Sequence, residues 1–131
     1  NDVASRQARA AGANALTDVT GFGLPGHLHE LASASGVSAV VDSSRVPAIE
    51  GALELLEGER AVAGGTRRNR ADAEGFSSFG EDVAPARAWL VCDAMTSGGL
   101  LAAIAPERAH EIDGWVVGHL ADGPAGTIDL V

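Results

Sequence analysis

The chain has 131 residues, of which 46% are hydrophobic and only 4% aromatic, and its formal net charge is −9. One globular domain is the expected class at this length, with a core of alanine, valine, leucine and isoleucine. The acidic balance argues against a nucleic-acid partner, because a nucleic-acid-binding surface needs basic residues to displace counterions. No apolar run approaches the roughly 20 residues that a membrane span needs, so no membrane partner is expected either.

The basic residues and the cysteine exclude further classes of site. All nine basic residues are arginine, and Cys92 is the only cysteine. Without lysine, a Walker-type phosphate loop and a Schiff base are excluded. A single cysteine excludes a disulfide framework and a zinc site built from cysteines. The same count favours a reducing, cytoplasmic setting.

The first part of the chain predicts two helices. The alanine- and arginine-rich stretch at 3–15 favours a helix that Gly12 closes. A second helix is expected over 24–35, with Pro25 in its first turn and Gly36 at its end.

Beyond the second helix, the stretch VSAVVD at 37–42 is rich in β-branched residues and predicts a strand. An amphipathic pattern predicts a helix over 48–57. Residues 58–86 carry many glycines among polar residues and are expected to be mostly loop.

The last third predicts mainly strands. Apolar runs at 86–93 and 100–105 indicate two buried strands, and a short helix is expected from 106 to 112. Two more strands are expected at 115–120 and 127–131, with a turn between them. This order of elements predicts an α+β fold in which a mixed sheet is layered with helices.

Residues 21–26, GFGLPG, match the G-x-G-x-x-G pattern of dinucleotide-binding proteins. That pattern normally follows a buried apolar strand, whereas Thr17-Asp18-Val19-Thr20 precedes it here. The Asp18 carboxylate would repel a pyrophosphate unless a cation lay between them. Pro25 removes one amide that a helix N-terminus would offer to phosphate. A dinucleotide site of the Rossmann type is therefore rejected.

Asp18 suits magnesium instead, because Mg²⁺ commonly takes one or two protein carboxylates together with phosphates and water. Gly21 and Gly23 would let the backbone approach a phosphate closely. The alternative is that Asp18 caps a turn that the two glycines permit. The local sequence leaves both interpretations open.

A second glycine-rich stretch, AVAGGTRRNR at 61–70, reverses the charge locally, since four of the nine arginines lie between Arg60 and Arg70. Backbone amides with guanidinium support can form an anion-binding concavity, which points to a phosphate ligand. A solvated surface loop is the alternative.

Four further positions carry weaker signals. Thr96–Gly99 lies between two predicted strands and is interpreted as a hairpin connection in preference to a phosphate-binding turn. Cys92 is expected to be a packed thiol. His27 is interpreted as a hydrogen-bonded structural histidine. The alternative is that it supports a ligand-binding residue or donates to a phosphate itself. His29 is expected to be exposed.

Three motifs in the same order, ALTDVTGFGLPGHLHELA, AVAGGTRRN and DAMTSGGLLAAI, resemble the C-terminal half of selenophosphate synthetase (selenide, water dikinase). The resemblance covers nearly the whole chain, and the long first motif is its most specific part. It implies the C-terminal domain fold of the aminoimidazole ribonucleotide synthetase-like ATP-binding family. Residues 1–131 are then one domain of a larger two-domain enzyme, without its N-terminal catalytic and dimerisation domain.

The resemblance also implies a reaction, in which ATP, selenide and water give selenophosphate, AMP and orthophosphate, with Mg²⁺ holding the polyphosphate. Asp18 matches the family's metal-binding aspartate in this half, which completes a carboxylate cluster drawn from the other half. The family's GGT-x-x-N loop and the first motif imply nucleotide or phosphate contacts from Thr20, Gly21, Gly64, Gly65, Thr66 and Asn69.

The chain departs from the family at Pro25, where leucine is common, and at Ala94-Met95, where Pro-Gln is common. The catalytic residues are expected in the absent half, so this chain alone should be inactive. The implied partners are its own N-terminal domain, ATP and selenide, with a homodimer formed by the full-length protein. Two alternatives are a related enzyme of this fold with a different small substrate, and a non-catalytic module that binds a nucleotide or a partner.

Overall fold

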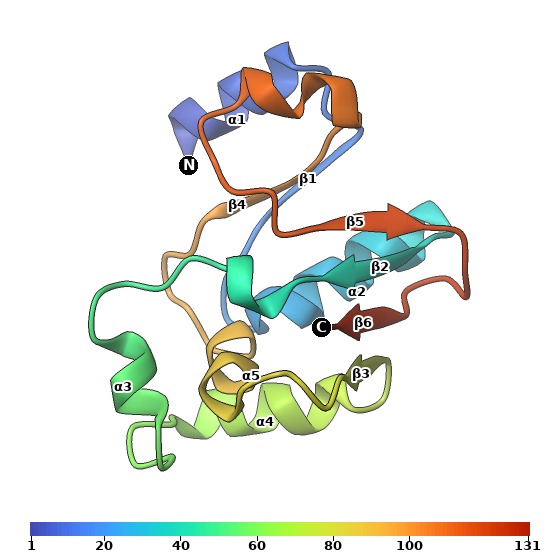
Figure 1. Cartoon of the computed structure of the whole chain (residues 1–131). Helices are drawn as coiled ribbons and strands as arrows, with labels where there is room; N and C mark the ends of the chain where they lie inside the picture. Colours follow the sequence, from blue (N-terminus) through green and yellow to red (C-terminus); the bar gives the residue numbers. More distant parts are fainter.

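The structure, a computed structural model, describes all 131 residues (Figure 1). Its helices are α1 (Asp2–Ala10), α2 (Gly23–Ser35), α3 (Ala52–Leu56), α4 (Gly64–Ala73) and α5 (Pro85–Val91), with short 3₁₀ helices η1 (Ser43–Arg45) and η2 (Pro106–Glu111). Its strands are β1 (Ala15–Asp18), β2 (Ser38–Val41), β3 (Ser77–Phe79), β4 (Leu100–Ala103), β5 (Gly118–Ala121) and β6 (Ile128–Leu130).

The strands form two sheets. β1 and β4 make an antiparallel pair, and the other four strands make a mixed sheet in the order β3-β6-β2-β5. β6 runs parallel to β2 and β3, whereas β2 and β5 are antiparallel. Helix α2 contacts both β2 and β6. The predicted α+β fold with a mixed sheet and packed helices is confirmed. None of the helices combines the length and apolar character that crossing a membrane requires.

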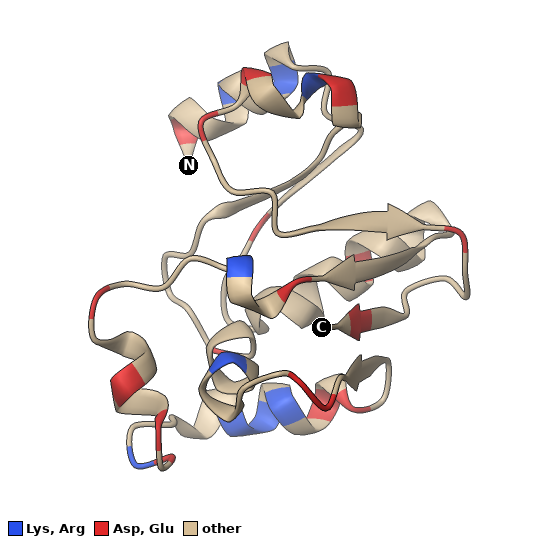
Figure 2. Cartoon of the chain, viewed as in Figure 1, with Lys and Arg blue, Asp and Glu red and all other residues tan.

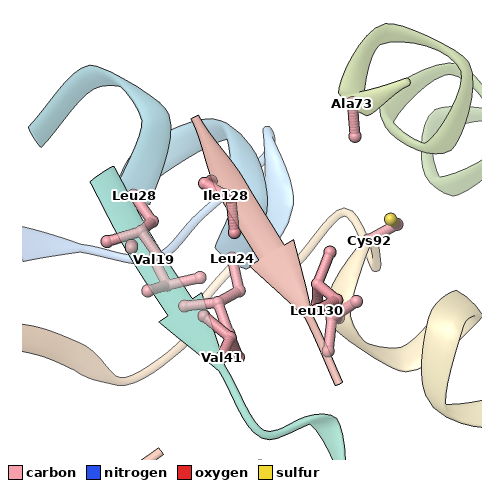
Figure 3. Packing of buried hydrophobic residues seen from close by; sticks show 10 residues of the cluster. Val19, Leu24, Leu28, Val41, Ala73, Cys92, Ile128 and Leu130 are labelled. Atoms are coloured by element: carbon pink, nitrogen blue, oxygen red, sulfur yellow. The ribbon is translucent and has the colours of Figure 1, made fainter. Parts of the chain in front are cut away.

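The core lies between the mixed sheet and α2 and extends to the end of α5. Figure 3 shows Val41 of β2 and Leu130 of β6 near Leu24 of α2. Alternate residues of β2 and β6 are buried, as a strand with one face on a core requires. Full burial of one such aliphatic side chain contributes about 1.5–3 kcal/mol to the free energy of unfolding. Cys92 is fully buried in this core, which confirms the expected packed thiol.

The largest error of the sequence prediction concerns 86–93, which was expected to be a buried strand and instead forms helix α5. Pro85 stands in the first turn of α5, where its missing amide and fixed φ are compatible with a helix. A short continuous apolar run cannot separate a buried strand from a buried helix segment, and tertiary packing decides between them.

Residues 58–86 are not mostly loop, because they contain α4 and β3. In α4 the two glycines stand at the N-terminus, and the arginine and alanine residues after them favour helix. β3 has only three residues and exists through its pairing with β6. β1 was not predicted either, and it depends in the same way on pairing with β4. These strands come from tertiary contacts that local propensity does not report.

Two other elements are shorter than predicted. Of the helix expected over 48–57, only α3 is formed. Ile49, which was to start its apolar stripe, is 83% exposed. The strand expected over 115–120 begins only at Gly118, and Trp115 before it is also exposed. In both cases the missing part has no core to pack against. The predictions for α2 and β2 are confirmed to within one residue at each end.

Candidate functional site

The candidate site begins at the end of β1, where successive side chains point in opposite directions. Val19 is buried in the core, whereas Asp18 is exposed and Thr20 is half-buried. Because side chains alternate along extended backbone, Asp18 and Thr20 lie on the same side, away from the core. The TDVT sequence thus presents a carboxylate and a hydroxyl together.

Asp18 and Thr20 line a depression of about 360 Å³ with Thr96, Ser97, Gly98 and Asn1, and none of the lining residues is hydrophobic. The Val19 amide donates to the Gly99 carbonyl at 2.9 Å, which holds the 96–99 turn against the end of β1. A Cβ at Gly98 would collide with the Val19 carbonyl oxygen, so only glycine allows this approach. The first and third sequence motifs therefore meet in one polar recess.

The turn at 96–99 is not the hairpin that the sequence predicted. It connects α5 to β4, because the segment before it is a helix. Its Thr96 and Ser97 side chains form a wall of the depression. Sequence reasoning did not place these hydroxyls in the site, and the TSGG glycines were the signal that could have done so.

The oxygen atoms that line the depression are suitable ligands for a hard cation. It offers the Asp18 carboxylate and the Thr20, Thr96 and Ser97 hydroxyls, which are oxygen ligands of the type Mg²⁺ prefers. Asn1 donates from Nδ2 to the Asp18 carboxylate. No group of three or more His, Cys, Asp or Glu side chains in the chain could hold a metal ion. Asp18 can therefore supply one carboxylate, and a complete site needs ligands from elsewhere.

His27 lies one turn into α2 and is joined to the depression through Thr20. Its Nε2 is 3.0 Å from Thr20 Oγ1, and both side chains are half-buried. The Phe22 ring packs beside the imidazole, with 5.7 Å between the ring centroids. Gly23 starts α2 with φ of +68°, and a Cβ there would meet the Cys92 backbone at 2.9 Å. The second glycine of GFGLPG thus serves close packing, and His27 is the hydrogen-bonded histidine that the sequence predicted.

Helix α4 ties the motifs together through two polar side chains. Thr66 is fully buried, and its Oγ1 donates to Asp93 Oδ1 at 2.7 Å. The Asn69 amide donates to the carbonyl oxygens of Gly21 at 2.8 Å and Cys92 at 3.0 Å. Gly64 and Gly65 form the first turn of α4. The glycines thus expose helix N-terminal backbone, while the Thr66 and Asn69 side chains bond within the fold.

Basic residues lie along α4 (Figure 2), and two of its arginines contact both an acidic side chain and an aromatic ring. Arg67 pairs with Glu59 at 3.2 Å and lies over the Trp89 ring. Arg70 pairs with Glu74 at 3.3 Å and covers the Phe79 ring. Ion pairs within the domain thus offset part of the local excess of positive charge. Residues 64–70 belong to α4, so the alternative of a surface loop is wrong, whereas phosphate binding by this stretch stays a prediction.

His29 is half-buried, which contradicts the expected exposure. Its Nδ1 donates to the Gly126 carbonyl at 2.8 Å, since a carbonyl oxygen can only accept. Its ring stacks on Phe76 with 4.0 Å between centroids. The sequence of α2 alone could not show that the distant segments around Gly126 and Phe76 cover this side of the helix.

These features define the class of domain as α+β, with a polar recess where the first and third glycine-containing motifs meet. Residues 1–130 match the family described as AIR synthase related protein, C-terminal domain, and the chain belongs to this family. The fold family that the resemblance implied is thereby confirmed.

Curated relatives agree with the resemblance. The chain is 48% identical over 114 residues to the selenide, water dikinase of Bordetella bronchiseptica, an overlap that covers 85% of this chain and 31% of the relative. It is 47% identical over 114 residues to the enzyme of the same name from Pseudomonas aeruginosa, with the same coverage. A Shewanella relative of that name is 37% identical over 144 aligned positions, covering 100% of this chain and 38% of the relative. The chain thus spans about a third of the length of these relatives.

Proposed function

We propose that this chain is the C-terminal domain of a selenide, water dikinase that converts ATP, selenide and water to selenophosphate, AMP and orthophosphate. The observation that carries the proposal is the polar depression, where the TDVT and TSGG motifs of the resemblance meet around Asp18. Its lining of oxygen donors suits a magnesium–polyphosphate ligand. The similarity of the whole chain to proteins named selenide, water dikinase supports the same reaction.

Asp18 is the residue of this chain that would bind magnesium. It supplies one carboxylate, and the remaining ligands come from the phosphates, from water and from carboxylates of the N-terminal domain. Bound Mg²⁺ would neutralise the charge that develops on the phosphoryl oxygens during transfer. Asp18 is exposed at the end of a paired strand, so its carboxylate is held at the surface where the second domain can approach it.

The nucleotide contacts are assigned to two places. The Thr20 hydroxyl and the Gly21 backbone face the phosphates from the loop after β1, and the backbone amides of Gly64 and Gly65 do so from the start of α4. Thr66 and Asn69 contribute by fixing these loops, because their side chains bond to Asp93, Gly21 and Cys92.

The absent N-terminal domain is the main partner in this proposal. It would carry the catalytic residues and the surface that forms the homodimer, so the present chain alone would be inactive. A cytoplasmic location stays a prediction from the unpaired Cys92.

The test is calorimetric titration of this chain with Mg²⁺ and ATP, first alone and then with the N-terminal domain supplied in trans. Binding only when both parts are present, with AMP formed on addition of selenide, is the expected result. Tight binding to this chain alone would contradict the split site. Binding without AMP formation would favour a related enzyme of this fold or a non-catalytic module.

A further inference from the structure

His27 lies outside the depression but contacts Thr20, which is one of its lining residues. Thr20 Oγ1 lines the recess and also lies 3.0 Å from His27 Nε2, whereas His27 itself is not among the lining residues. Thr20 belongs to an irregular turn, but His27 belongs to α2. The backbone of His27 is therefore held in a packed helix, whereas the backbone of Thr20 lies outside the helices and strands.

A threonine hydroxyl has one proton to donate and two lone pairs with which to accept. Phosphate oxygens only accept, so a hydroxyl that binds phosphate must keep its proton for that ligand. The histidine then has to donate from Nε2–H to Thr20 Oγ1. A bond in this direction holds one staggered rotamer of Thr20 and leaves the hydroxyl proton free for the depression.

We propose that His27 is a positioning residue that donates to Thr20 and thereby fixes the hydroxyl for contact with the polyphosphate of ATP. The inference rests on the proposed function, because it takes the depression as the phosphate site. His27 makes no contact with ATP in this arrangement and acts only through Thr20.

His29 provides a matched control within the same helix. It also makes one hydrogen bond, to the Gly126 carbonyl, and it also packs against an aromatic ring, that of Phe76. Its partners lie in the turns that precede β3 and β6, and they line no part of the depression. Loss of His29 should lower the thermal midpoint of unfolding and leave the kinetic constants unchanged.

The experiment measures AMP formation by the full-length enzyme at varied ATP and varied selenide. His27→Leu should lower kcat/KM for ATP about tenfold, the factor that one lost hydrogen bond accounts for, and should leave KM for selenide unchanged. His27→Gln should retain activity within about threefold of the wild type, because its amide can donate at the position of Nε2. Thr20→Val combined with His27→Leu should lose no more than Thr20→Val alone, since the histidine acts through that hydroxyl.

The role of His27 would be overturned if the losses of the two single variants multiplied in the double variant. It would also be overturned if Thr20→Val were impaired and His27→Leu were not. Either outcome would leave the proposed function standing. Equal losses in His27→Leu and His29→Leu would likewise overturn the role of His27. If His27→Leu fails to fold, His27→Asn replaces it, because asparagine is too short to reach Thr20 and should show the same loss. A wild-type enzyme that forms no AMP would overturn the proposed function, and the role of His27 with it.

Discussion

Thr66 and Asp93 are joined by a hydrogen bond of 2.7 Å between Oγ1 and Oδ1, although 27 positions separate them in the chain. The threonine is fully buried, and its hydroxyl also accepts from the Ala94 amide at 3.3 Å. This one side chain connects α4 to the segment that leads into the 96–99 turn. A motif that the sequence assigned to nucleotide contact thus also holds a wall of the depression in place.

Replacement of Thr66 by valine should lower the free energy of unfolding by about 1–3 kcal/mol, because the half-buried Asp93 carboxylate loses its donor while the packing volume is kept. Thr66→Ser, which retains the hydroxyl, should lose much less. Urea denaturation of both variants measures the difference. A valine variant as stable as the wild type would show that the hydrogen bond contributes nothing.

A second prediction concerns Gly98, whose backbone lies close to that of Val19, the residue after β1. A Cβ at Gly98 collides with the Val19 carbonyl oxygen, whereas one at the neighbouring Gly99 meets nothing within 4 Å. Gly98→Ala should therefore destabilise the chain by about 1–3 kcal/mol and displace the turn. Gly99→Ala should stay within about 0.5 kcal/mol of the wild type. Chemical denaturation of this adjacent pair tests the assignment, and equal stabilities would refute it.

Local signals in the sequence were sufficient for α2 and β2. Gly36 marks the end of α2, and the β-branched run of β2 stands between turn residues. They were insufficient for α5, because seven apolar-rich residues fit a buried strand as well as a buried helix. They also missed β1 and β3, which are strands only because β4 and β6 lie beside them.

The candidate site divides in the same way. Asp18 and Thr20 could be grouped from sequence because both belong to the first motif of the family resemblance. Thr96 and Ser97 could not, because they reach the site through a backbone contact between Gly98 and Val19. No periodicity or composition reports a contact between backbones that are so distant in sequence.

The buried thiol of Cys92 makes stability depend on alkaline pH. Burial raises its pKa from 9.0 to about 11. Between these values the unfolded chain loses the thiol proton while the folded chain retains it, so stability should fall as the pH rises from about 9 to about 11. The total loss is roughly 3 kcal/mol. The chain has no tyrosine or lysine, so no other such side chain titrates in this range.

Urea denaturation at several pH values between 9 and 11 measures this loss. In Cys92→Ala the dependence on pH should disappear, even though the variant is less stable throughout because a core side chain is shortened. An unchanged slope in the alanine variant would assign the effect to another group.

The last prediction concerns Asp18, in the full-length enzyme. Asp18→Ala should abolish ATP turnover, because a carboxylate ligand of the proposed magnesium site is lost. Its fold should be retained, since the side chain is exposed and contributes nothing to the core. Asp113→Asn removes another exposed carboxylate outside the depression and serves as the control. AMP formation and thermal unfolding are measured for both, and near wild-type turnover by Asp18→Ala would remove Asp18 from the metal site. Loss of turnover in both variants would point instead to the overall negative charge, and added salt would then reduce the wild-type rate as well.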